Sequence, residues 1–185
     1  MVVAPASRSV PQPKGWVATI AVLVIMVGIV GAGFFAQSAV ADIPNQPVEI
    51  SRGVILTQPP EWEFQGRADD QDTILLSRGN GSLAISVVEG TDERSALATL
   101  RDEWTASATV SAGDIRDATG VHGEQPAASF TYSGTFEGMA SAVEGEVTAV
   151  RGTSVVVVFD GWADIGDYAG VADDIAAIIA GTTIP

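Results

Sequence analysis

The hydrophobic pattern begins with one uninterrupted apolar run, residues 16–35 (WVATIAVLVIMVGIVGAGFF), which carries no charge. About 20 apolar residues are what an α-helix needs to cross a hydrocarbon core of about 30 Å. Arg8 and Lys14 precede the run, and the first charge after it is Asp42. Because Lys and Arg accumulate on the cytoplasmic side, the pattern predicts a single-pass helix with a cytoplasmic N-terminus and an extracytoplasmic C-terminal part.

Two interpretations of this run share that topology. In the first, it is a retained signal anchor, with a cytoplasmic tail at 1–15, a transmembrane helix at 16–35, a linker at 36–47 and an extracytoplasmic domain at 48–185. In the second, it is a long signal peptide, because Ala39-Val40-Ala41 has the small-residue form that signal peptidase accepts. Cleavage after Ala41 would release a secreted domain that starts at Asp42. The run is longer than the usual signal-peptide core of about 7–15 residues, which favours the anchor.

Beyond the linker, the pattern changes to short alternating segments that are typical of strands and are separated by Gly, Pro and Asn. Gly79-Asn80-Gly81 indicates a hairpin turn between two of these segments. Residues 109–126 are rich in Gly and fit a loop or a short strand. The strands are predicted at 48–57, 61–65, 73–77, 83–87, 127–132, 139–150 and 155–159, the last of them continuous, as in a strand covered on both faces.

Two segments have helical spacing instead. Residues 92–108 follow a cap at Thr91 or Asp92 and repeat apolar side chains every three to four positions, ending with Trp104 and Ala108. Residues 166–180 carry a second apolar stripe. The order of four strands, a helix, three strands and a helix, with tight connections, predicts an α+β domain. In it, an antiparallel sheet of about 6–7 strands packs with two helices.

Charge narrows the range of partners. All 23 acidic residues lie after the apolar run together with only seven basic residues, all Arg, so the exported part carries about −16. This charge repels nucleic acid and anionic lipid head groups, because both need cationic contacts, and it excludes nucleic acid as a partner. A cation or a basic protein remains compatible. The chain has no Cys, so it folds without disulfides and its membrane contact would depend on residues 16–35.

Candidate chemistry is sparse. Asp160, Asp164 and Asp167 lead from a strand into the last helix and are the weak candidates for a calcium site, although their spacing differs from an EF-hand. Asp167 as a helix N-cap would account for one of them without a metal. His122, the single His, lies in a Gly-flanked loop and is interpreted as a surface residue. Without Cys or a Gly-x-Ser-x-Gly motif, the sequence assigns no catalytic residue, no metal and no cofactor.

Three tryptophans, Trp62, Trp104 and Trp162, are the candidate ligand or partner contacts. Core packing accounts for most aromatic residues of such a domain, but Trp62 and Trp162 lie near loops, where we expect exposure. An apolar ligand held between sheet and helix would need a cavity of several hundred cubic ångströms behind Trp104 or Trp162.

Four short motifs mark the exported part: residues 54–62 (VILTQPPEW), residues 130–134 (FTYSG), the strand from Gly145 to Val150 and the valine strand that ends at Phe159. Together they resemble the PsbP/Mog1-like fold, as in the actinobacterial LpqN-type cell-envelope proteins. The likeness covers residues 48–184. It implies an accessory or binding domain, and it brings no shared catalytic set to carry over. The chain departs from the lipoproteins because it lacks the lipid-bearing Cys.

Three functions are compatible with these observations. The preferred one is a membrane-anchored, non-catalytic accessory domain that binds a protein partner or complex in the cell envelope. The alternative is an envelope carrier of a lipid or small molecule. A carboxylate-based hydrolase is less favoured, because paired carboxylates occur in any acidic domain and are not informative alone.

Overall fold

The computed structural model describes residues 47–57, 59–68, 70–106, 109–136 and 139–185. The predicted tail, transmembrane helix and cleavage site, and all of the linker except Pro47, lie outside these ranges. Within them, no helix is both long enough and apolar enough to cross a bilayer.

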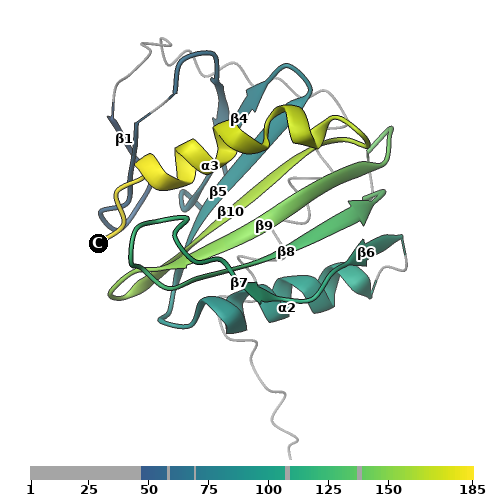
Figure 1. Ribbon diagram of the computed structural model, residues 1–185. Coiled ribbons are helices and arrows are strands. Elements are labelled where there is room, and N and C mark those ends of the chain that lie inside the picture. Colours follow the sequence, from purple (N-terminus) through teal and green to yellow (C-terminus); the bar gives the residue numbers. More distant parts are fainter. Residues whose placement is uncertain (1–46, 58, 69, 107–108, 137–138) are drawn as a thin grey trace, which may run out of the picture.

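One antiparallel sheet of eight strands forms the body of the described domain (Figure 1). Its order is β3-β4-β5-β10-β9-β8-β6, and β7 also pairs with β8. The short strands β6 and β7 arise from the Gly-rich region that the sequence left open, and they raise the count above the 6–7 predicted. The bounds are β3 Glu63–Arg67, β4 Thr73–Arg78, β5 Gly81–Glu89, β6 Val110–Ala112, β7 Arg116–Asp117, β8 Ala127–Gly134, β9 Val143–Arg151 and β10 Val155–Asp164.

The first predicted strand, 48–57, is wrong as a single element. It divides into β1 (Pro47–Glu49) and β2 (Ile55–Thr57), which pair with each other as a separate two-stranded sheet. Arg52 and Gly53 both have positive φ, 51° and 79°, so the chain turns back between the two strands. Ile55 also bridges to Thr183, which ties the C-terminal residues to this hairpin.

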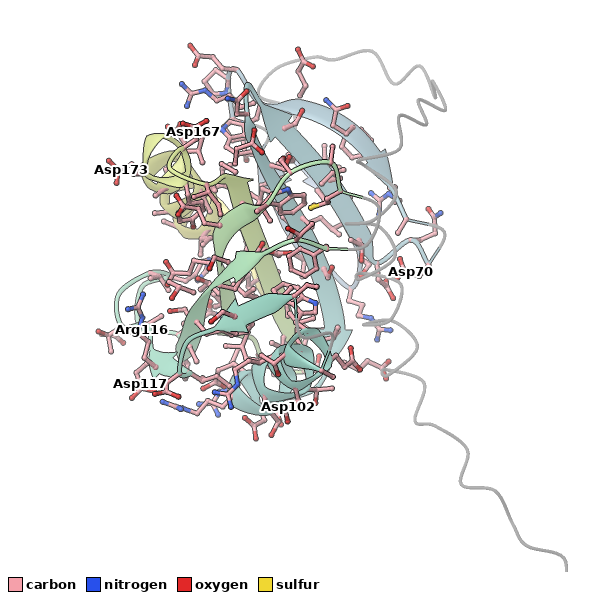
Figure 2. All side chains as sticks on the ribbon, turned by 90° about the vertical axis from the view of Figure 1, so that its right-hand side faces the viewer. Asp70, Asp102, Arg116, Asp117, Asp167 and Asp173 are labelled. Carbon is pink, nitrogen blue, oxygen red and sulfur yellow. The ribbon has the colours of Figure 1, made fainter. Side chains whose placement is uncertain are left out.

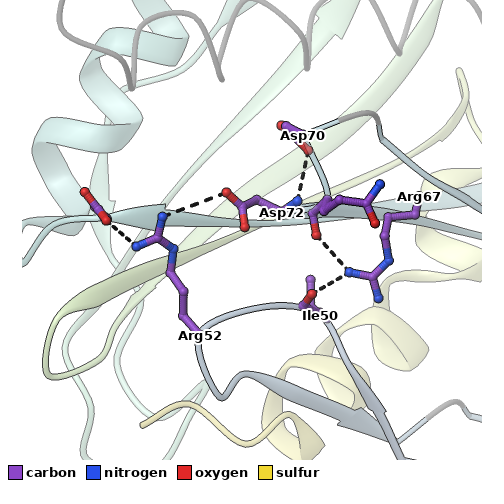
Figure 3. Close-up of polar contacts among 7 residues, drawn as sticks. Ile50, Arg52, Arg67, Asp70 and Asp72 are labelled. Atoms are coloured by element: carbon purple, nitrogen blue, oxygen red, sulfur yellow. Dashed lines mark hydrogen bonds and ion pairs between the residues drawn. The ribbon is translucent and has the colours of Figure 1, made fainter.

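Arginine side chains hold the β1–β2 hairpin against the main sheet (Figure 3). Arg67, at the end of β3, donates hydrogen bonds to the carbonyl oxygens of Glu49, Ile50 and Gln71. Arg52, in the hairpin turn, forms ion pairs with Asp72 and Glu89. These contacts join the N-terminal end of the described domain to β3, to the β3–β4 turn and to the end of β5.

The two helices cover opposite faces of the sheet. The helix α2 (Glu93–Thr105) begins at the predicted cap, Asp92, whose carboxylate accepts hydrogen bonds from the amides of Arg94 and Ser95. Its buried residues Leu97 and Leu100, with Trp104, pack on one face, and α3 (Ala172–Gly181) packs three isoleucines on the other. The predicted 166–180 helix begins late. Residues Tyr168–Gly170 form a short 3₁₀ helix, η1, and Asp167 makes no side-chain cap bond.

Strand alternation explains this two-faced core. In β10, Val156 and Val158 point toward α2, whereas Val155, Val157 and Phe159 point toward α3. The continuous valine run is therefore covered on both faces, as predicted. Burial of each such side chain contributes about 1.5–3 kcal/mol, so β10 stabilises the core on both faces of the sheet.

Candidate functional site

The three predicted tryptophan contacts all lie in the core. Trp62 and Trp104 are each 2% exposed, and Trp162 is 5% exposed, so the exposure expected of Trp62 and Trp162 is not observed. Trp104 instead packs edge-on against Phe130, Tyr132 and Phe136 beneath α2. Their contact with a ligand or partner stays a prediction.

The three weak metal candidates each bond a different partner. Asp160 is buried and accepts a hydrogen bond from Tyr132, Asp164 accepts one from Ser141, and Asp167 accepts one from Asn80. Within the described residues, no group of three or more His, Asp or Glu side chains is arranged to hold a metal ion.

His122 is half-buried rather than a free surface residue. Its Nε2 lies 2.5 Å from the carbonyl oxygen of Thr182, and Gln125 donates from Nε2 to the carbonyl oxygen of Ile184 at 3.3 Å. Through these hydrogen bonds, both side chains attach the Gly-rich loop to the C-terminal residues. Local sequence patterns carry no signal for this contact, because its partners lie about 60 positions apart.

A buried tyrosine–aspartate pair lies under α2. Tyr132 on β8 donates from its hydroxyl to Oδ1 of Asp160 on β10 at 2.8 Å, and the two residues are 5% and 1% exposed. Oδ2 of Asp160 has no hydrogen-bond partner among the described residues. Burial raises the pKa of Asp160 to about 7, which the hydrogen bond from Tyr132 partly opposes. Burial, followed by the charge of Asp160, also raises the pKa of Tyr132 well above its ordinary value.

Gly145 makes this pair sterically feasible. It lies on β9, between Tyr132 on β8 and Trp162 on β10, so the tyrosine side chain must cross over it to reach β10. A Cβ at Gly145 would lie 2.9 Å from the Cζ and Oη atoms of Tyr132 and 2.3 Å from the carbonyl oxygen of Gly161. Any side chain here would therefore displace the tyrosine or push the strands apart.

An open groove of about 570 Å³ lies on the other face of β8 and β9. We call it the outer groove and define it by Ser111, Thr131, Ser133, Glu144, Tyr168 and Ala172. Sheet residues form its floor, and η1 with the start of α3 forms one wall. Figure 2 shows Asp167 and Asp173 on the η1–α3 side and Arg116 and Asp117 on the far side of this region.

Glu144 orients the wall of the outer groove. Its Oε1 accepts hydrogen bonds from the backbone amides of Gly166 and Tyr168, which fixes the loop between β10 and η1. Beside it on β9, Glu146 pairs with Arg116 at 3.0 Å. Burial, followed by the charges of Glu146 and Asp160, raises the pKa of Tyr168, so its hydroxyl remains protonated and can donate or accept a hydrogen bond.

A second, smaller pocket lies between the start of α2 and the sheet. It measures about 160 Å³ and is lined mainly by apolar side chains, among them Val88, Ala96, Leu100, Val156 and Val158. This volume is below the range of about 300–1,000 Å³ that is usual for ligand pockets. It could take a short apolar group only.

Comparison with known proteins supports the fold. The structure of cyanobacterial PsbP (CyanoP) from Synechocystis sp. PCC 6803 is similar with a TM-score of 0.52 and 12% identity, over 83% of this chain and 100% of that one. LpqN of Mycobacterium tuberculosis, described as involved in cell envelope biogenesis, gives 0.49 and 18% identity, over 78% of this chain and 88% of that one. The Ran-binding protein Mog1p of Saccharomyces cerevisiae gives 0.48 and 15%, over 76% and 95%.

No protein-family model and no curated protein matches the sequence. At these identities, structural likeness shows the fold alone, and CyanoP, with the highest of the three TM-scores, carries that conclusion. The resemblance in the sequence is thereby confirmed at the level of architecture: the described domain has the PsbP/Mog1-like fold.

Proposed function

We propose that this chain is a membrane-anchored, extracytoplasmic accessory domain that binds a basic protein partner in the cell envelope and catalyses no reaction. The apolar run at 16–35, preceded by Arg8 and Lys14, supports the anchor and its orientation. The accessory role agrees with what the resemblance to the PsbP/Mog1-like fold implies.

The pairing of every Arg within the described ranges carries this proposal. Six of them form ion pairs with carboxylates of the same domain, and Arg67 binds three backbone carbonyl oxygens. Seven Arg against 23 Asp and Glu leaves an uncompensated charge of about −16. A partner therefore meets carboxylates, and a basic surface is the complementary one.

The arrangement of the carboxylates supports a binding role over a hydrolytic one. Asp160, the carboxyl group whose pKa is raised to about 7, lies in the core and binds Tyr132. Glu144, in the outer groove, uses one oxygen to hold backbone amides. Both are engaged in holding the fold together.

The test is recovery of the full-length chain from native membranes after mild crosslinking. We expect a basic protein to co-purify at low salt and to be lost when washing at about 1 M salt precedes the crosslinking, since the Debye length there is about 3 Å. A chain that consistently emerges alone would contradict the proposal. Cell fractionation tests the anchor, because a soluble product that starts at Asp42 would reject it.

The small pocket beneath α2 supports one alternative, a carrier of a short apolar group. Its lining by Val88, Leu100 and Val156 suits the end of an acyl chain. Native mass spectrometry of the purified chain would then show a bound apolar molecule, and Leu100→Trp, which fills the pocket, should remove it.

A further inference from the structure

The outer face of β8 and β9 is polar at the end of β8 and the start of β9. Thr131 on β8 lies opposite Glu146 on β9. Ser133, also on β8, lies between Glu144 on β9 and Ser111 on β6. Alternation places the apolar neighbours of these residues on the α2 side, so this face presents hydroxyl and carboxylate groups. The helix α3 packs on β10 and β2, and on the outer face of β8 Thr131 and Ser133 are exposed.

An exposed apolar side chain lies at one end of this face. Ile165 is 58% exposed, and it directly precedes Gly166, whose amide Glu144 holds. Asp167 follows in the same loop, and Asp173 lies in the first turn of α3. Figure 2 shows these two aspartates together on the η1–α3 side. The side chain of Asp167 bonds Asn80 in the β4–β5 turn, so the end of the groove combines the exposed Ile165 with the carboxylate of Glu144.

The charge of the groove limits what can occupy it. A second copy of the chain carries the same excess of acid, and an anionic lipid surface or a nucleic acid would also bring like charge to it. Arg116, which reaches the floor of this face, is paired with Glu146. A cationic occupant is the complementary one.

We propose that the outer groove is the docking site for an extended, Lys- or Arg-containing segment of the protein partner. The inference deepens the proposed function and rests on it. The hydroxyl groups of the floor bind the peptide backbone of the segment. Its cations face Glu144, and an apolar side chain lies against Ile165. Extended segments expose backbone donors and acceptors at regular spacing, which the alternating floor residues match.

The first experiment measures binding of a fluorescent heptapeptide that alternates Lys with Ala and Ser to the full-length chain in detergent. The groove variant is Glu144→Gln, because the amide keeps an oxygen that accepts the existing hydrogen bonds. Its matched control is Glu63→Gln, which removes the same charge away from the groove. Loss of one exposed ion pair should lower affinity about two- to fivefold in the groove variant and leave it nearly unchanged in the control.

The second experiment uses the absence of Cys in the chain. Ser133→Cys places a unique thiol on the floor of the groove, and Glu63→Cys places one on β3. The peptide should slow thiol modification at the first position and leave the second unchanged. Three results would each overturn the inference. They are an equal loss of affinity in the groove variant and its control, equal protection of both thiols, and binding of the matching Glu-containing peptide.

The two proposals can fail separately. If the groove variant still co-purifies with the partner from membranes, the docking site is wrong while the accessory function stands. If the unmodified chain recovers no partner, the accessory function itself fails, whatever the peptide does.

Discussion

Replacing Asp160 by Asn should remove a large pH dependence of stability. The variant keeps an oxygen that can accept from Tyr132 but cannot ionise. Burial raises the pKa of Asp160 from 3.8 to about 7, a shift of about 3 units, which corresponds to about 4 kcal/mol at 1.36 kcal/mol per unit. Because the side chain is only 1% exposed, solvent screening does not reduce this value.

The sign follows from proton binding. Between about pH 4 and 7 the folded chain holds a proton on Asp160 that the unfolded chain has released, so stability falls as pH rises. The contribution is complete below the unfolded pKa of 3.8 and is lost as pH passes through about 7. The parent should therefore lose about 4 kcal/mol of its free energy of unfolding, relative to Asp160→Asn, between about pH 4 and pH 8.

Urea denaturation of the full-length chain in mild detergent, followed by tryptophan fluorescence, measures this difference. Other carboxyl groups titrate in both proteins and cancel in the comparison. Asp164→Asn is the matched control, since it removes an exposed carboxylate of the same strand. Parallel pH profiles for the parent and Asp160→Asn would refute the reasoning, because they would mean that the buried carboxyl does not titrate differently on unfolding.

Three further substitutions separate stability from binding. Tyr132→Phe removes the one donor to Asp160, and we expect a loss of about 1–3 kcal/mol in the free energy of unfolding by urea titration. Gly145→Ala introduces a Cβ 2.3 Å from a backbone oxygen, and it should cost about 3 kcal/mol or more in the same assay; a wild-type midpoint would contradict the steric argument. Ile165→Ser removes an exposed side chain, so stability should change by less than about 0.5 kcal/mol while binding of the basic peptide weakens severalfold.

The core of this fold could be predicted from local patterns. The valine run of β10 predicted a strand covered on both faces, and helical spacing around Leu97 and Trp104 predicted α2 within three residues at its C-terminal end. Each of these signals depends on neighbours within a few positions, which is where alternation and helical periodicity act. The packing of α2 on the sheet then follows, because its apolar face must be buried.

The polar features could not be predicted in the same way. The sequence pattern ended the last strand at Phe159, because Asp and Gly are poor strand formers, whereas β10 continues to Asp164. The pairing of Tyr132 with Asp160 joins positions 28 apart through the register of three strands. The alternation of Val158, Asp160 and Trp162 on one face was the available signal. The outer groove likewise depends on where α3 starts. The 3₁₀ helix η1 delays that start to Ala172, and helical periodicity did not predict it.

Gly145 also constrains how relatives of this chain can vary. A side chain at this position requires a shift of the strands at the carbonyl oxygen of Gly161 and a residue 132 that no longer crosses the strand. Without the Tyr132 hydroxyl, the Asp160 carboxyl group loses its partner. The three positions thus form one coupled unit, in which the effects of single substitutions do not add. Sequences that carry any larger residue at 145 should have lost the tyrosine and the aspartate together.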